Sequence, residues 1–166
     1  PTVNVHLNIQ EDYVTDTINM ISAAVTLGDD MSTMKTTSHI INGIDYLTDD
    51  FTYEQTHMRE QTLLSEALTE IHQLIKEVGN QAMTVTRSGN QPSDSVCLYP
   101  QGYLHFYTYD QQEITRLQES LHRHRGTNEM ISTFSDVLDF RYGSEVPEDP
   151  EQDISSALYP EIERQR

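Results

Sequence analysis

The chain has 166 residues, a formal net charge of −17 at pH 7 and a single cysteine. This length fits one domain with a real core, one cysteine excludes an internal disulfide, and the charge disfavours direct binding to nucleic acid or to an anionic membrane. No apolar run is long enough to span a membrane, and the first residues lack the pattern of a signal peptide. We therefore expect a soluble protein synthesised in the cytoplasm.

The acidity has two further readings. Acidic residues number 27, and the 10 basic residues include only two lysines, Lys35 and Lys76. Few lysines and many acids are typical of a protein from concentrated salt, where screening removes self-repulsion. The rival reading is a DNA mimic whose carboxylates imitate phosphates. The sequence alone leaves both readings open.

The N-terminal part predicts one strand and two helices. Apolar and polar residues alternate over residues 3–9, which indicates a half-buried strand. A 4-3-4 apolar spacing then predicts a helix over roughly 11–27, ended by Gly28; it is formed by Val14, Ile18, Ile21 and Val25. A weaker helical pattern containing Gly43 follows, with Met34, Ile41, Ile44 and Leu47 as its apolar residues.

The third predicted helix has the clearest pattern. Thr52 and Gln55 fit a capping box, apolar residues then recur at spacings of three and four up to Val78, and Gly79 follows. About 26 residues at about 1.5 Å each make a rod of about 39 Å. A helix of this length in a small domain predicts either the spine of the fold or a seam between subunits.

The rest of the chain predicts a hairpin, two helices and a tail. Residues 82–86 resemble a strand, and residues 95–99 and 103–109 predict a β-hairpin with Pro100 opening the turn. Helices are predicted from residue 111 to a stop at Gly126 and again around 130–138. Residues 144–166 contain three prolines and many acids, which predicts an extended tail.

These elements together predict an α+β fold. We expect a single domain over residues 1–143, with a small mixed sheet built from the N-terminal strand and the central hairpin. About five helices pack against this sheet, on one face. Residues 144–166 form an acidic, proline-containing tail that we interpret as an interaction segment.

The segment His122-Arg123-His124-Arg125 is the most unusual in the chain. Cations at the end of a helix complement its dipole, so a structural role is one reading. Two histidines at i and i+2 point about 200° apart on a helix, which disfavours a shared metal. The other reading is a docking patch, formed together with Arg116.

The acidic tail is the predicted partner of this basic cluster, because arginine pairs well with carboxylates. We expect the tail to pack across a subunit boundary with the arginines as one anchor. The predicted tail residues of this interface are Glu148, Asp149, Glu151 and Asp153.

Three tyrosines complete the predicted interface. Tyr103, Tyr107 and Tyr109 share one face of a predicted strand with His105. Such a face could stack bases, but the net charge opposes this, and tyrosine is favoured where proteins meet. We therefore expect packing against a helix or a protein partner.

Two acidic pairs are interpreted as helix caps rather than as cation ligands. Asp29-Asp30 and Asp49-Asp50 each precede a predicted helix, where carboxylates satisfy free backbone amides. No calcium-loop pattern accompanies either pair.

No nucleophile elbow, phosphate-binding loop or zinc motif is present in the sequence. The sequence therefore favours a non-enzymatic structural or adaptor subunit with no cofactor or metal, which contacts copies of itself or other protein subunits. By analogy, a virion connector, tail-terminator or decoration protein fits such a chain. The alternatives are an acidic DNA-mimic inhibitor of a nucleic-acid-binding protein and a small enzyme with a dispersed active site.

Overall fold

A computed structural model of the chain describes residues 2–41, 52–79, 84–87, 95–98 and 104–143. The elements follow in the order β1 (Val3–Asp12), β2 (Thr17–Leu27), β3 (Asp30–Ile40), α1 (Tyr53–Gly79), β4 (Thr84–Arg87), β5 (Ser95–Leu98), β6 (Leu104–Thr108), α2 (Gln111–Arg123) and α3 (Glu129–Tyr142). The predicted α+β fold is confirmed.

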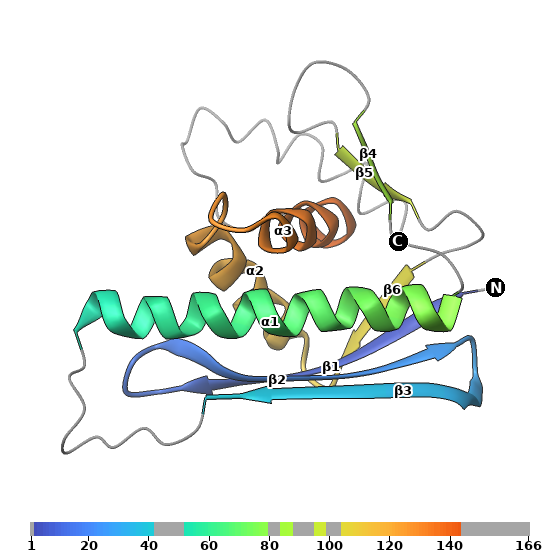
Figure 1. Cartoon of the computed structure of the whole chain (residues 1–166), viewed down its shortest axis with the longest axis horizontal. Coiled ribbons are helices and arrows are strands. Elements are labelled where there is room, and N and C mark those ends of the chain that lie inside the picture. Colours follow the sequence, from blue (N-terminus) through green and yellow to red (C-terminus); the bar gives the residue numbers. More distant parts are fainter. Residues whose placement is uncertain (1, 42–51, 80–83, 88–94, 99–103, 144–166) are drawn as a thin grey trace.

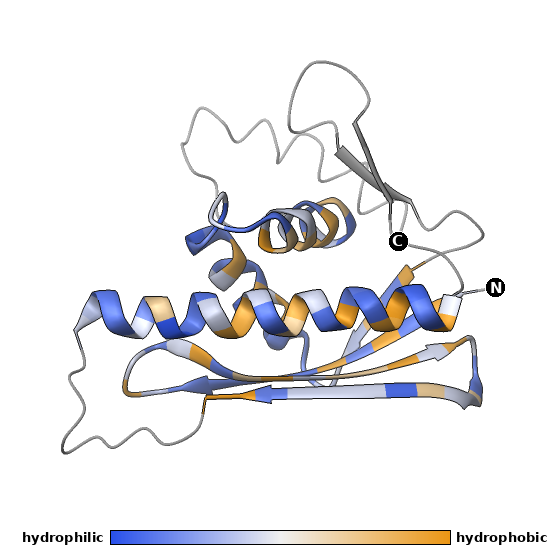
Figure 2. Ribbon diagram, in the orientation of Figure 1, coloured by the Kyte–Doolittle hydropathy of each residue, from blue (hydrophilic) through white to orange (hydrophobic). Residues whose placement is uncertain are grey.

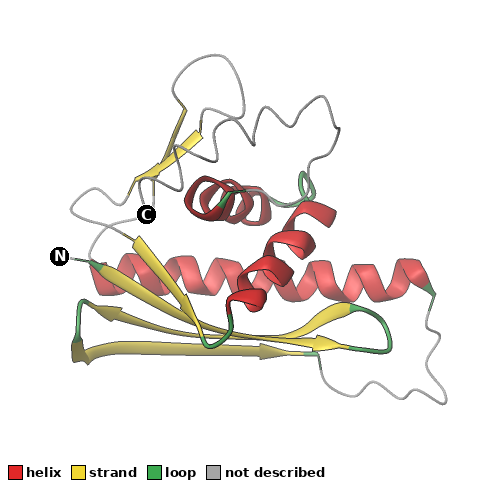
Figure 3. Cartoon of the chain, turned by 180° about the vertical axis from the view of Figure 1, so that it is seen from behind, coloured by secondary structure: helices red, strands yellow, loops and turns green. Residues whose placement is uncertain are grey.

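A mixed four-stranded sheet organises the molecule. Its strand order is β3-β2-β1-β6, with β1 antiparallel to β2 and parallel to β6, while β4 and β5 form a separate two-stranded sheet. Helix α1 lies along one face of the large sheet, and α2 and α3 lie on that same side (Figures 1 and 3). None of the described helices and strands covers the other face.

The core lies between the sheet and α1. The alternating residues of β1 bury Val3, Val5, Leu7 and Ile9 on the helix side, as their period of two requires. Ile21 and Val25 of β2 join them from the neighbouring strand. The predicted N-terminal strand is therefore confirmed, together with the side that it buries.

The helix predicted over residues 11–27 is wrong. These residues form the end of β1, a turn and β2, which pairs with β1 from Val3 opposite Leu27 to Asp12 opposite Thr17. Val14, assigned above to the apolar stripe of a helix, is 73% exposed in the turn. The segment is rich in β-branched residues, which favour strands, and the adjacent β1 offers it a hydrogen-bonded partner.

In the segment after Gly28 where a helix was expected, residues 30–40 form a strand instead, and Gly43, Ile44 and Leu47 lie outside the described residues. Asp30–Ile40 form β3, and Gly28 adopts φ +57° in the connection between β2 and β3 rather than ending a helix. Asp30 does not cap a helix, because its carboxylate accepts hydrogen bonds from the amide and hydroxyl of Ser32 at 3.0 and 2.6 Å. Asp49-Asp50 lies outside the described residues.

The prediction that residues 95–99 and 103–109 pair as a β-hairpin is wrong. Residues 95–98 pair with β4, and β6 lies in parallel beside β1, far from it in sequence. The part of the chain that the structure describes holds three helices rather than about five, because two predicted helices are strands. The predicted tail, residues 144–166, lies outside the described residues.

Helix α1 confirms the strongest prediction. The hydroxyl of Thr52 accepts a hydrogen bond from the amide of Gln55 at 3.1 Å, and the helix runs from Tyr53 to Gly79. Its apolar residues alternate with hydrophilic ones along the ribbon (Figure 2). Since α1 contacts both the sheet and α3, it is the spine of the fold.

Candidate functional site

Two residues of the predicted basic cluster, Arg123 and His124, hold a buried carboxylate. Glu60 lies on α1 with no solvent exposure. Its Oε1 accepts hydrogen bonds from Arg123 Nη1 at 2.6 Å and His124 Nε2 at 2.7 Å, and its Oε2 accepts one from the amide of Ile18 at 2.7 Å. One carboxylate thus joins α1, the end of α2 and the start of β2.

These contacts set the ionisation of Glu60. Burial by itself raises the pKa of a carboxyl group, but the hydrogen bonds from His124, from the Ile18 amide and from Arg123 favour the charged form and lower the pKa below its ordinary value. The group therefore stays ionised at neutral pH. A buried carboxylate satisfied on both oxygens by its own chain is a structural clamp.

The remaining cluster residues also pair with acids of the described chain. His122 Nε2 lies 2.6 Å from Asp139, which joins the end of α2 to α3. Arg125 contacts Asp136 and lies 3.9 Å from Asp139. The two histidines thus reach two different carboxylates, as their spacing on a helix predicts.

Arg116, the last member of the cluster, lies 3.6 Å from Glu11 at the end of β1. The predicted partners of the cluster in residues 144–166 lie outside the described residues, so the tail contact stays a prediction. Among the residues that the structure describes, no three His, Cys, Asp or Glu side chains form a group able to hold a metal ion.

A second buried carboxylate was missed by the sequence analysis. Glu113 of α2 accepts hydrogen bonds from the amide of Ile9 at 2.9 Å and from the amide of Asp110 at 3.0 Å. The spacing Asp110-x-x-Glu113 is that of a capping box, which could have predicted it. Glu60 also had a signal, because it lies four residues before Leu64, in phase with the buried row of α1.

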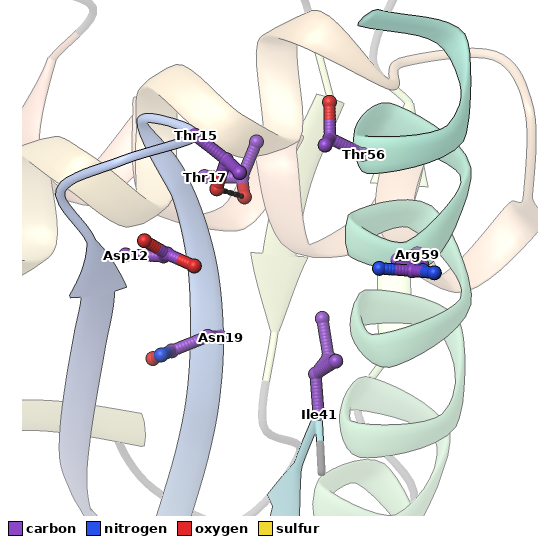
Figure 4. Close-up of a pocket in the computed structure, with 7 residues that line it drawn as sticks. All are labelled: Asp12, Thr15, Thr17, Asn19, Ile41, Thr56 and Arg59. Carbon is purple, nitrogen blue, oxygen red and sulfur yellow. Dashed lines mark hydrogen bonds between the residues drawn. The ribbon is translucent and has the colours of Figure 1, made fainter. Parts of the chain in front are cut away.

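A small polar cavity lies beside this region (Figure 4). Its volume is about 10 Å³, which has room for about one water molecule. The lining side chains come from the β1–β2 end of the sheet, from the end of β3 and from α1; they are Asp12, Thr15, Thr17, Asn19, Ile41, Thr56 and Arg59. The cavity is too small for a substrate.

A shallow groove lies between the end of β3 and α1. Its volume is about 370 Å³, and it is wide open to solvent. Ile40, Ile41, Met58 and Leu63 supply apolar surface, while Arg59 and Glu66 supply charge. The groove lacks converging catalytic groups among these lining residues.

The largest unusual surface is the sheet face opposite α1, which we call the open face. Strand register and alternation assign to it Asn4, His6, Asn8, Gln10, Met20, Ser22, Ala24, Thr26, Met34, Thr36, Ser38, Ile40, His105 and Tyr107. Asn4 and Thr26, which both donate a hydrogen bond to the Gly28 carbonyl, are buried. None of these residues is Asp, Glu, Lys or Arg. In a chain with 27 acids, a sheet face without one formal charge is unexpected.

The open face contains one of the three predicted interface tyrosines. Tyr107 is 45% exposed and stacks on His6 of β1, with ring centroids 5.0 Å apart. Tyr109, just after β6, is fully exposed, and Tyr103 lies outside the described residues. Partial burial, followed by the nearby Arg141, lowers the pKa of His105, so this histidine is neutral at neutral pH.

Comparison with known proteins gives no relative: no family model, curated protein or solved structure matches this chain. Among the helices of the described residues, none combines the length and the apolar character needed to cross a membrane.

Proposed function

We propose that this chain is a non-enzymatic structural or adaptor subunit of a larger protein assembly, acting through protein–protein contacts. The observation that carries the proposal is the charge-free open face. Charged residues are depleted at the centre of protein interfaces, because each would have to lose its water on binding. An uncharged sheet face on a chain of net charge −17 has the composition of such a centre.

The side chains of the open face are better suited to contact with another protein than to catalysis. Ser22, Ala24 and Ser38 are small and lie on neighbouring strands, and the hydroxyls of Ser22 and Ser38 hydrogen bond to each other at 2.8 Å. Small side chains at these positions let another backbone approach closely. By analogy, connector, tail-terminator and decoration subunits of virions work through such contacts without catalysis.

A crosslinking experiment in the native host tests this proposal. A photoreactive amino acid replaces Thr36, at an exposed position of the open face, or Thr69, at an exposed position of α1 on the other side of the sheet. We expect an adduct of one defined mass from position 36 and none from position 69. Absence of an adduct at position 36, or equal adducts at both positions, overturns the proposal.

A further inference from the structure

We infer that the partner of the open face is a second copy of this chain, bound face to face about a twofold axis. This inference rests on the proposed function and names the occupant of the same surface. The dimer then has four layers in the order helix, sheet, sheet and helix. Three features of the open face support a second copy as its partner: its charge, the size of its side chains and its area.

Charge selects the partner. A positively charged protein would be drawn to the acidic surfaces of the chain, such as the exposed row Glu54, Glu66, Glu70 and Glu77 on α1. The open face offers such a partner no attraction. A partner that is also acidic can bind only through a surface where no carboxylates of the two proteins come together. A second copy of this chain is equally acidic, and the open face is such a surface.

Face-to-face packing also keeps the acids of the two copies apart. Helix α1 lies on the side of the sheet away from the open face (Figure 1). With layers about 10 Å apart, the two α1 helices are about 30 Å from each other. The Debye length is about 8 Å at physiological ionic strength, so their repulsion is screened there.

Side-chain sizes fit a close approach of two sheets. On the inner strand β2, Ser22 and Ala24 are small and Met20 is larger, while the half-exposed Met34, Ile40 and Tyr107 lie on the two edge strands. Small residues at the centre let the sheets approach, and the larger ones at the rim bury apolar area. A twofold axis through β2 would place each rim against the other copy.

The area is sufficient for a specific dimer. Strands of about ten residues at about 3.4 Å each, spaced about 4.8 Å apart, give the open face a projected area of about 600 Å². Two copies together bury about 1,200 Å², the lower limit of specific interfaces. We therefore expect a reversible dimer whose population depends on protein concentration.

Light scattering after size exclusion tests the inference on the purified full-length protein. The chain has a mass of 19.1 kDa, so a dimer has twice this mass. We expect the dimer for the wild type at high concentration, the monomer for Ala24→Glu, and the dimer for the matched control Thr69→Glu. Ala24 lies between His6 and Thr36 at the centre of the open face, so its substitution places like charges together.

Two further measurements identify the surface. In a Cys97→Ser background, a bismaleimide crosslinker that spans the separation of two packed sheets, about 10 Å, should join two copies of Ala24→Cys but not two copies of Thr69→Cys. Raising ionic strength from about 0.01 M to about 0.15 M should tighten the dimer, because the Debye length falls from about 30 Å to about 8 Å. A dimer held by ion pairs would weaken instead.

The outcomes separate this inference from the proposed function. A purified protein that is monomeric at every concentration, with a crosslinked adduct at position 36 in the host, overturns the second copy as partner and leaves the assembly role standing. A dimer that persists in Ala24→Glu overturns the face-to-face arrangement. A monomer with no adduct at position 36 overturns both.

Discussion

The two faces of the large sheet treat charge in opposite ways. The covered face tolerates a fully buried carboxylate, Glu60, because Arg123, His124 and a backbone amide hold it. The residues assigned to the open face include no Asp, Glu, Lys or Arg, although most of them are accessible to solvent. Charge in this molecule is therefore placed where the fold supplies a partner or water, and is excluded from the surface that we propose to meet another protein.

Two adjacent alanines of β2 point to opposite faces of the sheet, so substitutions there test the difference between the faces most directly. Ala23 faces α1 and is 4% exposed, whereas Ala24 faces away from it. We expect Ala23→Glu to lower the free energy of unfolding by more than about 4 kcal/mol, because it buries a charge without a partner. Ala24→Glu should change the free energy of unfolding of the monomer by less than about 1 kcal/mol.

Urea unfolding followed by circular dichroism measures both values, at protein concentrations where the wild type is monomeric. Equal losses from the two substitutions would mean that the open face is covered in the folded monomer. The distinction between the two faces would then fail.

The Glu60 clamp predicts the next largest effect. Glu60→Gln keeps the shape of the side chain but removes the charge that holds Arg123 and His124, and we expect a loss of about 3 kcal/mol. The matched control is Glu70→Gln on the same helix. Glu70 pairs with His39 at 2.6 Å but is exposed, so its loss should stay below about 1 kcal/mol. Similar losses would show that burial does not distinguish these carboxylates.

The contribution of Glu60 to stability should also depend on pH. Because the pKa of Glu60 is lower in the folded chain than in the unfolded one, its stabilisation is fully present above the ordinary glutamate pKa of about 4.3. That stabilisation is lost as pH falls through the folded-state value. We expect the stability gap between the wild type and Glu60→Gln to narrow in this acidic window. A gap that widens on acidification, measured by urea unfolding, would contradict the clamp.

Local signals predicted local structure well. The capping box at Thr52 and the apolar row of α1 predicted that helix almost to the residue, and the helix predicted from residue 111 corresponds to α2. The same reasoning failed between Val14 and Val25. There a spacing of 4-3-4 fits a helix, but alternate positions of the same segment also suit a strand that pairs with β1.

For the cluster around Glu60, the sequence predicted that the basic residues were unusual but not which residue they contact. The sequence singled out Arg123 and His124 as unusual, but their partner Glu60 lies more than sixty positions away. The open face could not be predicted while β2 and β3 were expected to be helices. A sheet face is defined by residues of several strands, so its lack of charge becomes visible only after the strands are paired.

The acidic surface, the long amphipathic helix and the half-buried first strand could all be predicted from the sequence. Each follows either from composition or from the regular spacing of apolar residues within one segment. Only the tertiary structure decided that β6 lies beside β1, that the basic cluster turns inward onto Glu60, and that uncharged residues from four strands share one face. The physical reason is that strand pairing and buried ion pairs join distant residues, and no local pattern encodes the choice of partner.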